Sequence, residues 1–264
     1  MKKIILLLSF FSTSCFLFHC SDKSSPEPEI DSDNNEENSD PFIDSFEGNG
    51  DLVGYTTNNP EVLPNVGRRS GRYYAELIDN SDNQTLHYHE QQGRLDAKLV
   101  SFPFEFIARN IGIGTIEDSQ VAPSASGEPF NFAGVQLHVL DLESPNSAHV
   151  VVGHRGSTSF TIEGKNTLNG NSSVNDIGIN EVSDGRADIR IVGKDDNTVT
   201  VYWQLPNLNH ADKEDNWTLY NGTGNLPGQA PTFGEEVYVG LITYAFYTTG
   251  VPFVGTCDQI EIEE

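Results

Sequence analysis

Short runs in which apolar and polar residues alternate recur along the chain from residue 73 to the C-terminus. A period of two is typical of half-buried β-strands, because successive side chains of a strand point to opposite faces of the sheet. The runs are rich in Val, Ile, Thr, Phe and Tyr, which favour strands. They predict strands at 73–78, 85–90, 104–111, 134–140, 149–153, 159–163, 187–192, 198–204, 237–245 and 259–262.

Turn-forming segments separate these runs. They include Asn-Gly and Asp-Gly pairs and three polar stretches, at 164–166 (Gly-Lys-Asn), 194–197 (Lys-Asp-Asp-Asn) and 206–209 (Pro-Asn-Leu-Asn). No amphipathic pattern longer than two helical turns is present, and no internal repeat. The sequence therefore predicts an all-β fold, a single two-sheet antiparallel sandwich of about a dozen strands.

The first nineteen residues have a different pattern. Lys2 and Lys3 precede an apolar run at 4–18, which is the length of a secretory signal core and short for a membrane span. The segment resembles a bacterial lipoprotein signal, in which a lipidated Cys begins the mature chain. Cys20 is the expected site, since Leu17 stands three residues before it. Lipidation at Cys15 and an ordinary cleaved secretory signal are the alternatives.

Residues 20–41 form an acidic segment between this signal and the predicted domain. Residues 21–41 hold eight acidic residues, one Lys and three Pro, and their one large apolar residue is Ile30. No core can form from such a composition, so the segment is expected to be a disordered tether. The predicted organisation is a signal peptide at 1–19, a tether at 20–41 and one domain at 42–264. The expected location is the bacterial outer membrane, facing the cell surface or the periplasm.

The formal net charge of the chain is −24. Nucleic-acid backbones and anionic lipid surfaces both attract Lys and Arg, so binding to nucleic acid is not expected, and membrane contact is expected only through the lipid anchor. Cys257 is the one cysteine of the predicted domain. It has no partner for a disulfide and is expected to be a buried apolar residue.

Three segments carry a resemblance to a known fold. They are 42–48 (Phe-Ile-Asp-Ser-Phe-Glu-Gly), 238–244 (Tyr-Val-Gly-Leu-Ile-Thr-Tyr) and 257–262 (Cys-Asp-Gln-Ile-Glu-Ile). Their layout resembles the first and last strands of the concanavalin A-like lectin/glucanase jelly roll. The resemblance implies two stacked, curved antiparallel sheets, one of which holds a glycan on its concave face. It also implies a polysaccharide as partner.

Assigning the more apolar residues of each strand to the core leaves a set of polar side chains facing outward. In the strand at 149–155 the phase is open, because Val150, Val151 and Val152 are consecutive: one phase turns His149 and Arg155 outward, and the other His154. The outward set comprises Arg109, Gln136, His138, Arg190, Tyr202 and Gln204, with Tyr244 and either His149 or His154 as additions. Arg residues on the strands of an acidic protein suggest a local site for an anionic glycan. The alternative is that these Arg residues pair with Glu105 and Asp188.

Two kinds of glycan-cleaving chemistry were compared. Retaining glucanases of this fold carry paired carboxylates in a Glu-x-Asp-x-x-Glu pattern, which is absent from this sequence. Gln136-Leu137-His138 resembles the Gln-Ile-His strand of jelly-roll alginate lyases, although the other two strand motifs of those enzymes are absent. Lyases neutralise the carboxylate of a uronic acid, remove the C5 proton and protonate the leaving oxygen. The resemblance suggests Gln136 and Arg109 for the carboxylate, His138 as base and Tyr202 as acid.

A polysaccharide lyase is thus the expected function, with no catalytic cofactor. A non-catalytic surface glycan-binding lipoprotein is the first alternative, and a glycoside hydrolase of the same fold is the second. The expected substrate-binding residues are Arg190, Gln204, His154, Arg155, Tyr244 and Trp217. The fold resemblance also implies a structural Ca²⁺ held by Glu47 and Asp258, unless both acids cap turns. His87 and His89 share a face of their strand and are a weaker metal pair.

Overall fold

The computed structural model of the chain describes residues 40–77, 93–115, 130–155, 160–182, 185–246 and 253–264. The predicted signal peptide with Cys20, most of the tether, and His87 and His89 lie outside these residues. Lipidation, the domain boundaries and the cellular location therefore stay predictions. Within the described residues the regular structure is β-strand apart from one 3₁₀ turn, η1 (Tyr220–Gly222). No helix in that part of the chain has the length and apolar character to span a membrane.

Sheet A has nine strands, all paired antiparallel, with the main order β13-β12-β11-β6-β15-β4-β3. Its strands are β1 (Phe42–Asp44), β3 (Asn65–Arg69), β4 (Arg72–Leu77), β6 (Phe104–Gly114), β11 (Arg186–Gly193), β12 (Val199–Gln204), β13 (Thr218–Leu219), β15 (Phe253–Cys257) and β16 (Gln259–Glu263). Strand β6 pairs with β16 along its first half and with β15 along its second half. Among the described strands, β1 pairs with β16 alone.

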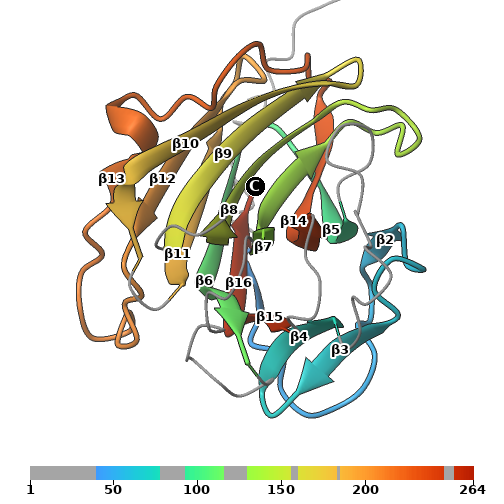
Figure 1. Cartoon of the computed structure of the whole chain (residues 1–264), viewed down its shortest axis with the longest axis vertical. Coiled ribbons are helices and arrows are strands. Elements are labelled where there is room, and N and C mark those ends of the chain that lie inside the picture. Colours follow the sequence, from blue (N-terminus) through green and yellow to red (C-terminus); the bar gives the residue numbers. More distant parts are fainter. Residues whose placement is uncertain (1–39, 78–92, 116–129, 156–159, 183–184, 247–252) are drawn as a thin grey trace, which may run out of the picture. The chain divides into compact units, whose positions relative to one another are not determined.

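Sheet B has seven strands in the order β10-β9-β8-β7-β14-β5-β2, also antiparallel. They are β2 (Thr56–Asn58), β5 (Arg94–Ser101), β7 (Phe130–His138), β8 (Ser147–Arg155), β9 (Phe160–Leu168), β10 (Asn171–Glu181) and β14 (Glu236–Phe246). In Figure 1 both sheets can be followed from left to right, sheet B from β10 to β2 and sheet A from β13 to β3. The two layers together form the predicted two-sheet jelly-roll sandwich.

Two of the hairpins show why the predicted turn residues are needed. The β9–β10 loop is Asn169-Gly170 and the β3–β4 loop is Ser70-Gly71, and all four residues have positive φ, at 51°, 77°, 55° and 71°. Two consecutive positive φ angles define the two-residue turn whose twist matches paired strands, and Asn and Gly adopt them at least cost. These turns fix the register of the strands on either side.

The core lies between the sheets and is built by the alternation expected from the sequence. Val135 and Leu137 of β7 are fully buried, and Ala133 and Thr243 on the same face of sheet B lie against β15 of sheet A. A Cβ atom at Gly255 would come within 2.4 Å of Thr243 Oγ1 and 3.1 Å of Ala133 Cβ. The side of sheet B that carries Val135 therefore faces sheet A, and the alternate residues lie on the opposite side, here called the outer face of sheet B.

One predicted turn is wrong. Residues 164–166, Gly-Lys-Asn, lie inside strand β9 rather than in a loop. Gly164 is needed there because a Cβ would lie 2.6 Å from Leu226 Cδ2 and 2.7 Å from the Tyr220 hydroxyl. The glycine thus marks a close approach of η1 to the sheet, not a chain reversal. The correction extends β9 to Leu168 and places Lys165 in the middle of a strand.

Candidate functional site on the outer face of sheet B

A row of polar residues crosses three neighbouring strands of sheet B. Gln136 of β7 pairs with His149 of β8, and His149 pairs with Lys165 of β9. On the other side of β7, Gln136 pairs with Gly240 of β14. Because paired residues of adjacent strands lie on the same face of a sheet, Gln136, His149 and Lys165 share the outer face. The register settles the phase of β8: His149 faces outward.

Tyr244 and Glu163 join this row. The Tyr244 hydroxyl lies 3.4 Å from His149 Nε2, and the two rings are 5.5 Å apart at their centroids. Lys165 Nζ is 6.0 Å from the centre of the Tyr244 ring. Glu163 is two residues before Lys165 on β9 and therefore on the same face. Gln136, His149, Glu163, Lys165 and Tyr244 are called the polar cluster below.

The polar cluster is almost entirely buried, with exposed fractions of 0–2% for all five residues. Two of its atoms, Gln136 Nε2 and His149 Nδ1, have no hydrogen-bond partner among the described residues. A buried polar atom without a partner costs roughly 1–3 kcal/mol, so native proteins seldom keep one without a reason. The two atoms belong to side chains directly opposite each other on β7 and β8. A ligand that bonds to both would remove this cost.

Burial also sets the charges of the cluster. It lowers the pKa of Lys165 to about 7, although the charge of Glu163 acts in the opposite direction. Burial lowers the pKa of His149 well below its usual range, and the nearby Lys165 lowers it further. His149 is therefore neutral at neutral pH, and Lys165 is close to its midpoint. A neutral imidazole and a readily titrated amine are groups that can accept or donate protons near pH 7.

His138 lies on the same face as Gln136, as the period of two predicts, but at the last residue of β7. Its Nδ1 is 2.9 Å from the carbonyl oxygen of Val139, and its opposite neighbours are Ser147 and Tyr238. Burial lowers its pKa. His138 lies two residues beyond Gln136 on β7, next to Ser147. His149, rather than His138, therefore lies beside Gln136 and Tyr244.

The predicted substrate-binding residues of β8 divide between the two faces. His154 pairs with Asn131 and Phe160, and its ring meets the Phe160 ring at 5.3 Å. It follows the inward phase of the strand, opposite to His149, and is buried, so its assignment to the glycan face is wrong. Arg155 pairs with Phe130 at the end of β8, and the structure describes only its backbone.

Arg109 is not part of this site. It lies on β6 of sheet A, where its Nε is 2.8 Å from Glu261 and its Nη1 lies 2.9 and 3.0 Å from the two oxygens of Asp215. Asp188 is 3.7 Å away. Burial alone would lower the pKa of Arg109, but the bonds to Glu261 and Asp215 outweigh it and raise the pKa. Three carboxylates thus occupy the guanidinium, and the prediction that it binds a substrate carboxylate is wrong.

The remaining predicted site residues also lie on sheet A or beside it. Arg190 of β11 forms an ion pair with Glu105, as the alternative interpretation of the Arg residues holds. Tyr202 of β12 pairs with Arg190, and Trp217 lies over the guanidinium groups of Arg109 and Arg190, at 5.4 and 6.0 Å. The predicted catalytic group is therefore split between two sheets: Gln136 and His138 on sheet B, Arg109 and Tyr202 on sheet A.

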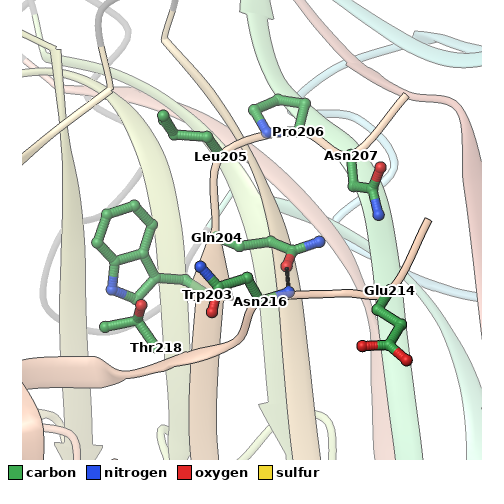
Figure 2. Close-up of a pocket in the computed structure, with 8 residues that line it drawn as sticks. All are labelled: Trp203, Gln204, Leu205, Pro206, Asn207, Glu214, Asn216 and Thr218. Carbon is green, nitrogen blue, oxygen red and sulfur yellow. Dashed lines mark hydrogen bonds between the residues drawn. The ribbon is translucent and has the colours of Figure 1, made fainter. Parts of the chain in front are cut away.

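Gln204 acts as a connector on sheet A. Its Nε2 donates to Asp188 and Asp215, both at 2.8 Å, and its Oε1 accepts the backbone N–H of Asn216 at 2.6 Å, drawn as the dashed line in Figure 2. These bonds attach the loop between β12 and β13 to the sheet. They leave no free donor on the Gln204 amide, so the structure gives it a positioning role in place of the predicted contact with substrate.

A surface pocket of about 370 Å³ lies where this loop leaves β12. Figure 2 shows the Trp203 indole on one side and Glu214 on the other, with Gln204 and Asn216 between them. An aromatic ring beside amide and carboxylate groups is a usual environment for a sugar residue. The pocket lies at the end of β12 in sheet A, away from the strands that carry the polar cluster.

The predicted calcium ligands do not form a described metal site. Asp258 pairs with Arg72, and its second oxygen accepts the Asn110 side-chain amide at 2.7 Å. Glu47 is exposed. Within the part of the chain that the structure describes, no group of three or more His, Cys, Asp or Glu residues could hold a metal ion. The structural Ca²⁺ remains a prediction, and the Asp258 carboxylate already has a cationic partner. Cys257 is buried, as predicted.

Sequence reasoning missed Glu163 and Lys165 and left His149 undecided. The signal that could have found them is the alternation of 160–168, in which Thr161, Glu163, Lys165 and Thr167 occupy every second position. The sequence Gly-Lys-Asn has the composition of a turn, and this concealed the alternation. A strand with four consecutive polar residues on one face, next to a strand with Gln and His, would have indicated the cluster.

Comparison with known proteins agrees on the fold and goes no further. No family model matches the chain, and no curated protein matches it. Among solved structures, a bifunctional GH43-CE protein of Bacteroides eggerthii matches with a TM-score of 0.53 and 14% identity over 84% of this chain. The chain spans about a quarter of that protein, 25% of its length.

Two further solved structures match over nearly their whole length. A Bacillus licheniformis β-glucanase has a TM-score of 0.43 and 10% identity, with 86% of this chain and 99% of that chain covered. The CBM2 module of the evolved Dit of Lactobacillus casei BL23 phage J-1 has a TM-score of 0.45 and 11% identity, with 84% and 94% covered. At these identities the similarity concerns the sandwich alone, and function rests on the site.

Proposed function

We propose that this protein is carbohydrate-active, that it holds a glycan on the outer face of sheet B, and that it cleaves a uronic-acid-containing polysaccharide by β-elimination at the polar cluster. The observation that carries the proposal is the pair of unpartnered buried atoms, Gln136 Nε2 and His149 Nδ1, beside the Tyr244 hydroxyl. The fold is one on which glycans are bound and cleaved, and this supports the substrate class.

The residues fit the three tasks of the reaction. Gln136 would donate a hydrogen bond to the C5 carboxylate, and the charge of Lys165 would stabilise the enolate that forms when the C5 proton leaves. With its proton on Nε2, donated to Tyr244, His149 has a lone pair on Nδ1 and can take the C5 proton. Tyr244 then gives its hydroxyl proton to the leaving oxygen as the C4–O bond breaks and the C4=C5 double bond forms.

These roles keep the chemistry expected from the sequence and move it to different residues. His149 replaces His138 as the base, and Tyr244 replaces Tyr202 as the acid. Gln136 keeps its role, while Lys165 takes the place of Arg109 as the cation. The proposed substrate remains an anionic polysaccharide, because the free amide donor and the lysine both complement a carboxylate.

Absorbance near 235 nm tests the proposal, because only elimination creates the unsaturated uronate. The purified protein is incubated with a panel of uronate-containing and neutral polysaccharides. We expect a signal on at least one uronate polymer and a loss of about 100-fold or more in rate in His149→Gln and Tyr244→Phe. Tyr202→Phe and Arg190→Gln are the matched controls on sheet A and should keep full activity. A signal that survives both sheet B substitutions would show that the cluster is not the catalytic centre.

A second candidate, glycoside hydrolysis, has one observation in its favour. The register of β9 and β10 pairs Glu163 with Asp176, so two acidic residues occupy directly opposite positions of the two strands. Retaining glycosidases need two carboxyl groups about 5 Å apart. New reducing ends without absorbance near 235 nm, abolished by Glu163→Gln and by Asp176→Asn, would establish this reaction. Retention of the protein in a glycan-containing gel without any product would indicate a binding protein.

A further inference from the structure

The strongest unexplained feature outside the polar cluster is a pair of buried arginines on sheet A. Arg72 opens β4 and Arg186 opens β11, and they are only 7% and 2% exposed. Their charges are close enough that Arg72 lowers the pKa of Arg186, which burial, the larger cause, brings down to about 9. Two buried cations whose charges interact repel each other, so negative charge or hydrogen-bond acceptors around them must offset the repulsion.

The described partners of the two guanidinium groups use only some of their N–H donors. Arg186 donates through Nε to the side-chain oxygen of Asn110 at 2.8 Å, and through Nη2 to the Asn110 carbonyl and to Thr256. Arg72 forms an ion pair with Asp258 through Nε. Asn110 also donates to Asp258 at 2.7 Å and so connects the two arginines. Every polar group of Asn110 and Thr256 that points to this cluster is therefore in use.

Three donor nitrogens remain. Arg72 Nη1, Arg72 Nη2 and Arg186 Nη1 are buried, and none has a hydrogen-bond partner among the described residues. The two arginines carry two positive charges and Asp258 carries one negative charge. The cluster thus has one uncompensated positive charge and three unused N–H donors in a chain whose net charge is −24. A buried charge without compensation is among the most costly features a fold can contain.

We infer that Arg72 and Arg186 form an internal binding site for a small monovalent anion, such as chloride. One negative charge balances the cluster, and the three free nitrogens supply the hydrogen bonds. Asp258, whose side chain is 36% exposed, marks the side from which solvent reaches the cluster. The inference concerns sheet A and stands or falls independently of the chemistry proposed for sheet B.

The location gives the anion a structural role. Arg186, Arg72 and Asp258 belong to or adjoin β11, β4 and the junction of β15 with β16, and Asn110 belongs to β6. An anion between them would add a further link to the side-chain bonds that Arg186, Asn110 and Asp258 already make among these strands. It occupies the place where the fold resemblance led us to expect a calcium ion. The two expected ions have opposite charges, so Asp258 has opposite effects on their binding. Its carboxylate would be a ligand for calcium, but it would compete with an anion for the arginines.

Thermal unfolding at constant ionic strength tests the inference. Chloride replaces gluconate, an anion too large for the site, and ³⁵Cl line broadening is measured on the same samples. We expect chloride to raise Tm of the full chain by about 3 °C or more, because a ligand that binds only the native state stabilises it. Arg72→Gln should abolish the rise and the broadening. Arg190→Gln, which removes an arginine paired with Glu105 on the same sheet, should keep both.

Asp258→Asn sharpens the test. It removes the competing carboxylate, so chloride should bind at least tenfold more tightly than to the wild type. No chloride effect in the wild type, or the same effect in Arg72→Gln as in Arg190→Gln, would overturn the inference. A rise of Tm with Ca²⁺ that Asp258→Asn abolishes would overturn it in favour of a cation site.

Discussion

Arg109 and His149 occupy comparable places and have opposite surroundings. Each lies within a strand, on the face of its sheet turned away from the core, and each is more than nine-tenths buried. Arg109 has three carboxylates around it, and two of them bond to it directly. His149 has one weak contact with Tyr244, and its second ring nitrogen has no hydrogen-bond partner among the residues that the structure describes. A buried polar side chain is therefore not by itself a sign of a binding site. A buried polar atom without a hydrogen-bond partner is the more informative sign.

The two sets of residues differ in how far their hydrogen-bonding groups are used within the protein. The network around Arg109 includes Asp188, Asp215 and Gln204, and it fixes the loop between β12 and β13 to the sheet. Its three carboxylates outnumber its one guanidinium, and the donors Arg109 Nε, Arg109 Nη1 and Gln204 Nε2 are all bonded to carboxylates inside the protein. The polar cluster has two buried atoms without a hydrogen-bond partner among the described residues, Gln136 Nε2 and His149 Nδ1, and an amine, Lys165, whose pKa burial lowers to about 7.

The largest expected effect comes from breaking the Arg109 network. Arg109→Met leaves three carboxylates close together without their cation, and removing one partner of a buried ion pair typically costs about 3–5 kcal/mol. We expect a loss of that size in the free energy of unfolding, measured in urea, with no specific effect on glycan cleavage per folded molecule. Arg190→Met, in a part-exposed pair with Glu105, should cost less than about 1 kcal/mol. Equal costs would show that the Arg109 network is not special.

The two faces should also differ in the pH range over which they affect stability. The native pKa of Lys165 is about 7, against 10.5 for a free lysine, so between these values the unfolded chain binds more protons. The free energy of unfolding should therefore rise with pH in this window, by up to about 1.4 kcal/mol per pH unit. Lys165→Met should lack this rise. Urea unfolding of both proteins at pH 7, 8, 9 and 10 measures the difference, and parallel profiles would contradict the burial-lowered pKa.

Asp215, which bonds to Arg109 of sheet A, affects stability in a different pH range. Burial raises the pKa of Asp215, but hydrogen bonds from Asn207, Gln204 and Arg109 outweigh it, and the net shift is downward. A carboxylate with a lowered native pKa stabilises the fold above its unfolded pKa, about 3.9, and that contribution is lost as the pH falls through the native value. Asp215→Asn should therefore leave the profile between pH 7 and 10 unchanged, which makes it the control for Lys165→Met.

The smallest expected effect has the opposite sign. Gln136→Met removes a buried amide whose Nε2 has no partner and replaces it with an apolar side chain of similar volume. We expect stability to rise by about 1 kcal/mol, because the cost of an unsatisfied buried donor disappears. Activity on a uronate polymer should fall in the same variant. If the variant is less stable and fully active, Gln136 stabilises the folded structure and does not bind substrate.

Much of the fold could be predicted because alternation reports burial directly. Val135 and Leu137, or Ile189 and Ile191, show which residues face the core without any knowledge of the partner strands. The site could be predicted only in part. Gln136 and Tyr244 were placed on the outward side of their strands, where the structure has them, because these strands alternate clearly. Arg109 was misassigned because nothing local indicates that Asp215 and Glu261, 106 and 152 residues away, bond to it.

The pairing of the first and last strands has a mechanical consequence. β1 is attached to the sandwich through three residue pairs with β16, from Phe42 with Ile262 to Asp44 with Ile260. A pull on the chain from its N-terminal side reaches these pairs before any other ladder. Each bond in so short a ladder bears a large share of the load, so β1 would detach while the other strands of both sheets stay paired. The β1–β16 ladder is therefore the part of the domain that we expect to break first under tension from the N-terminal side.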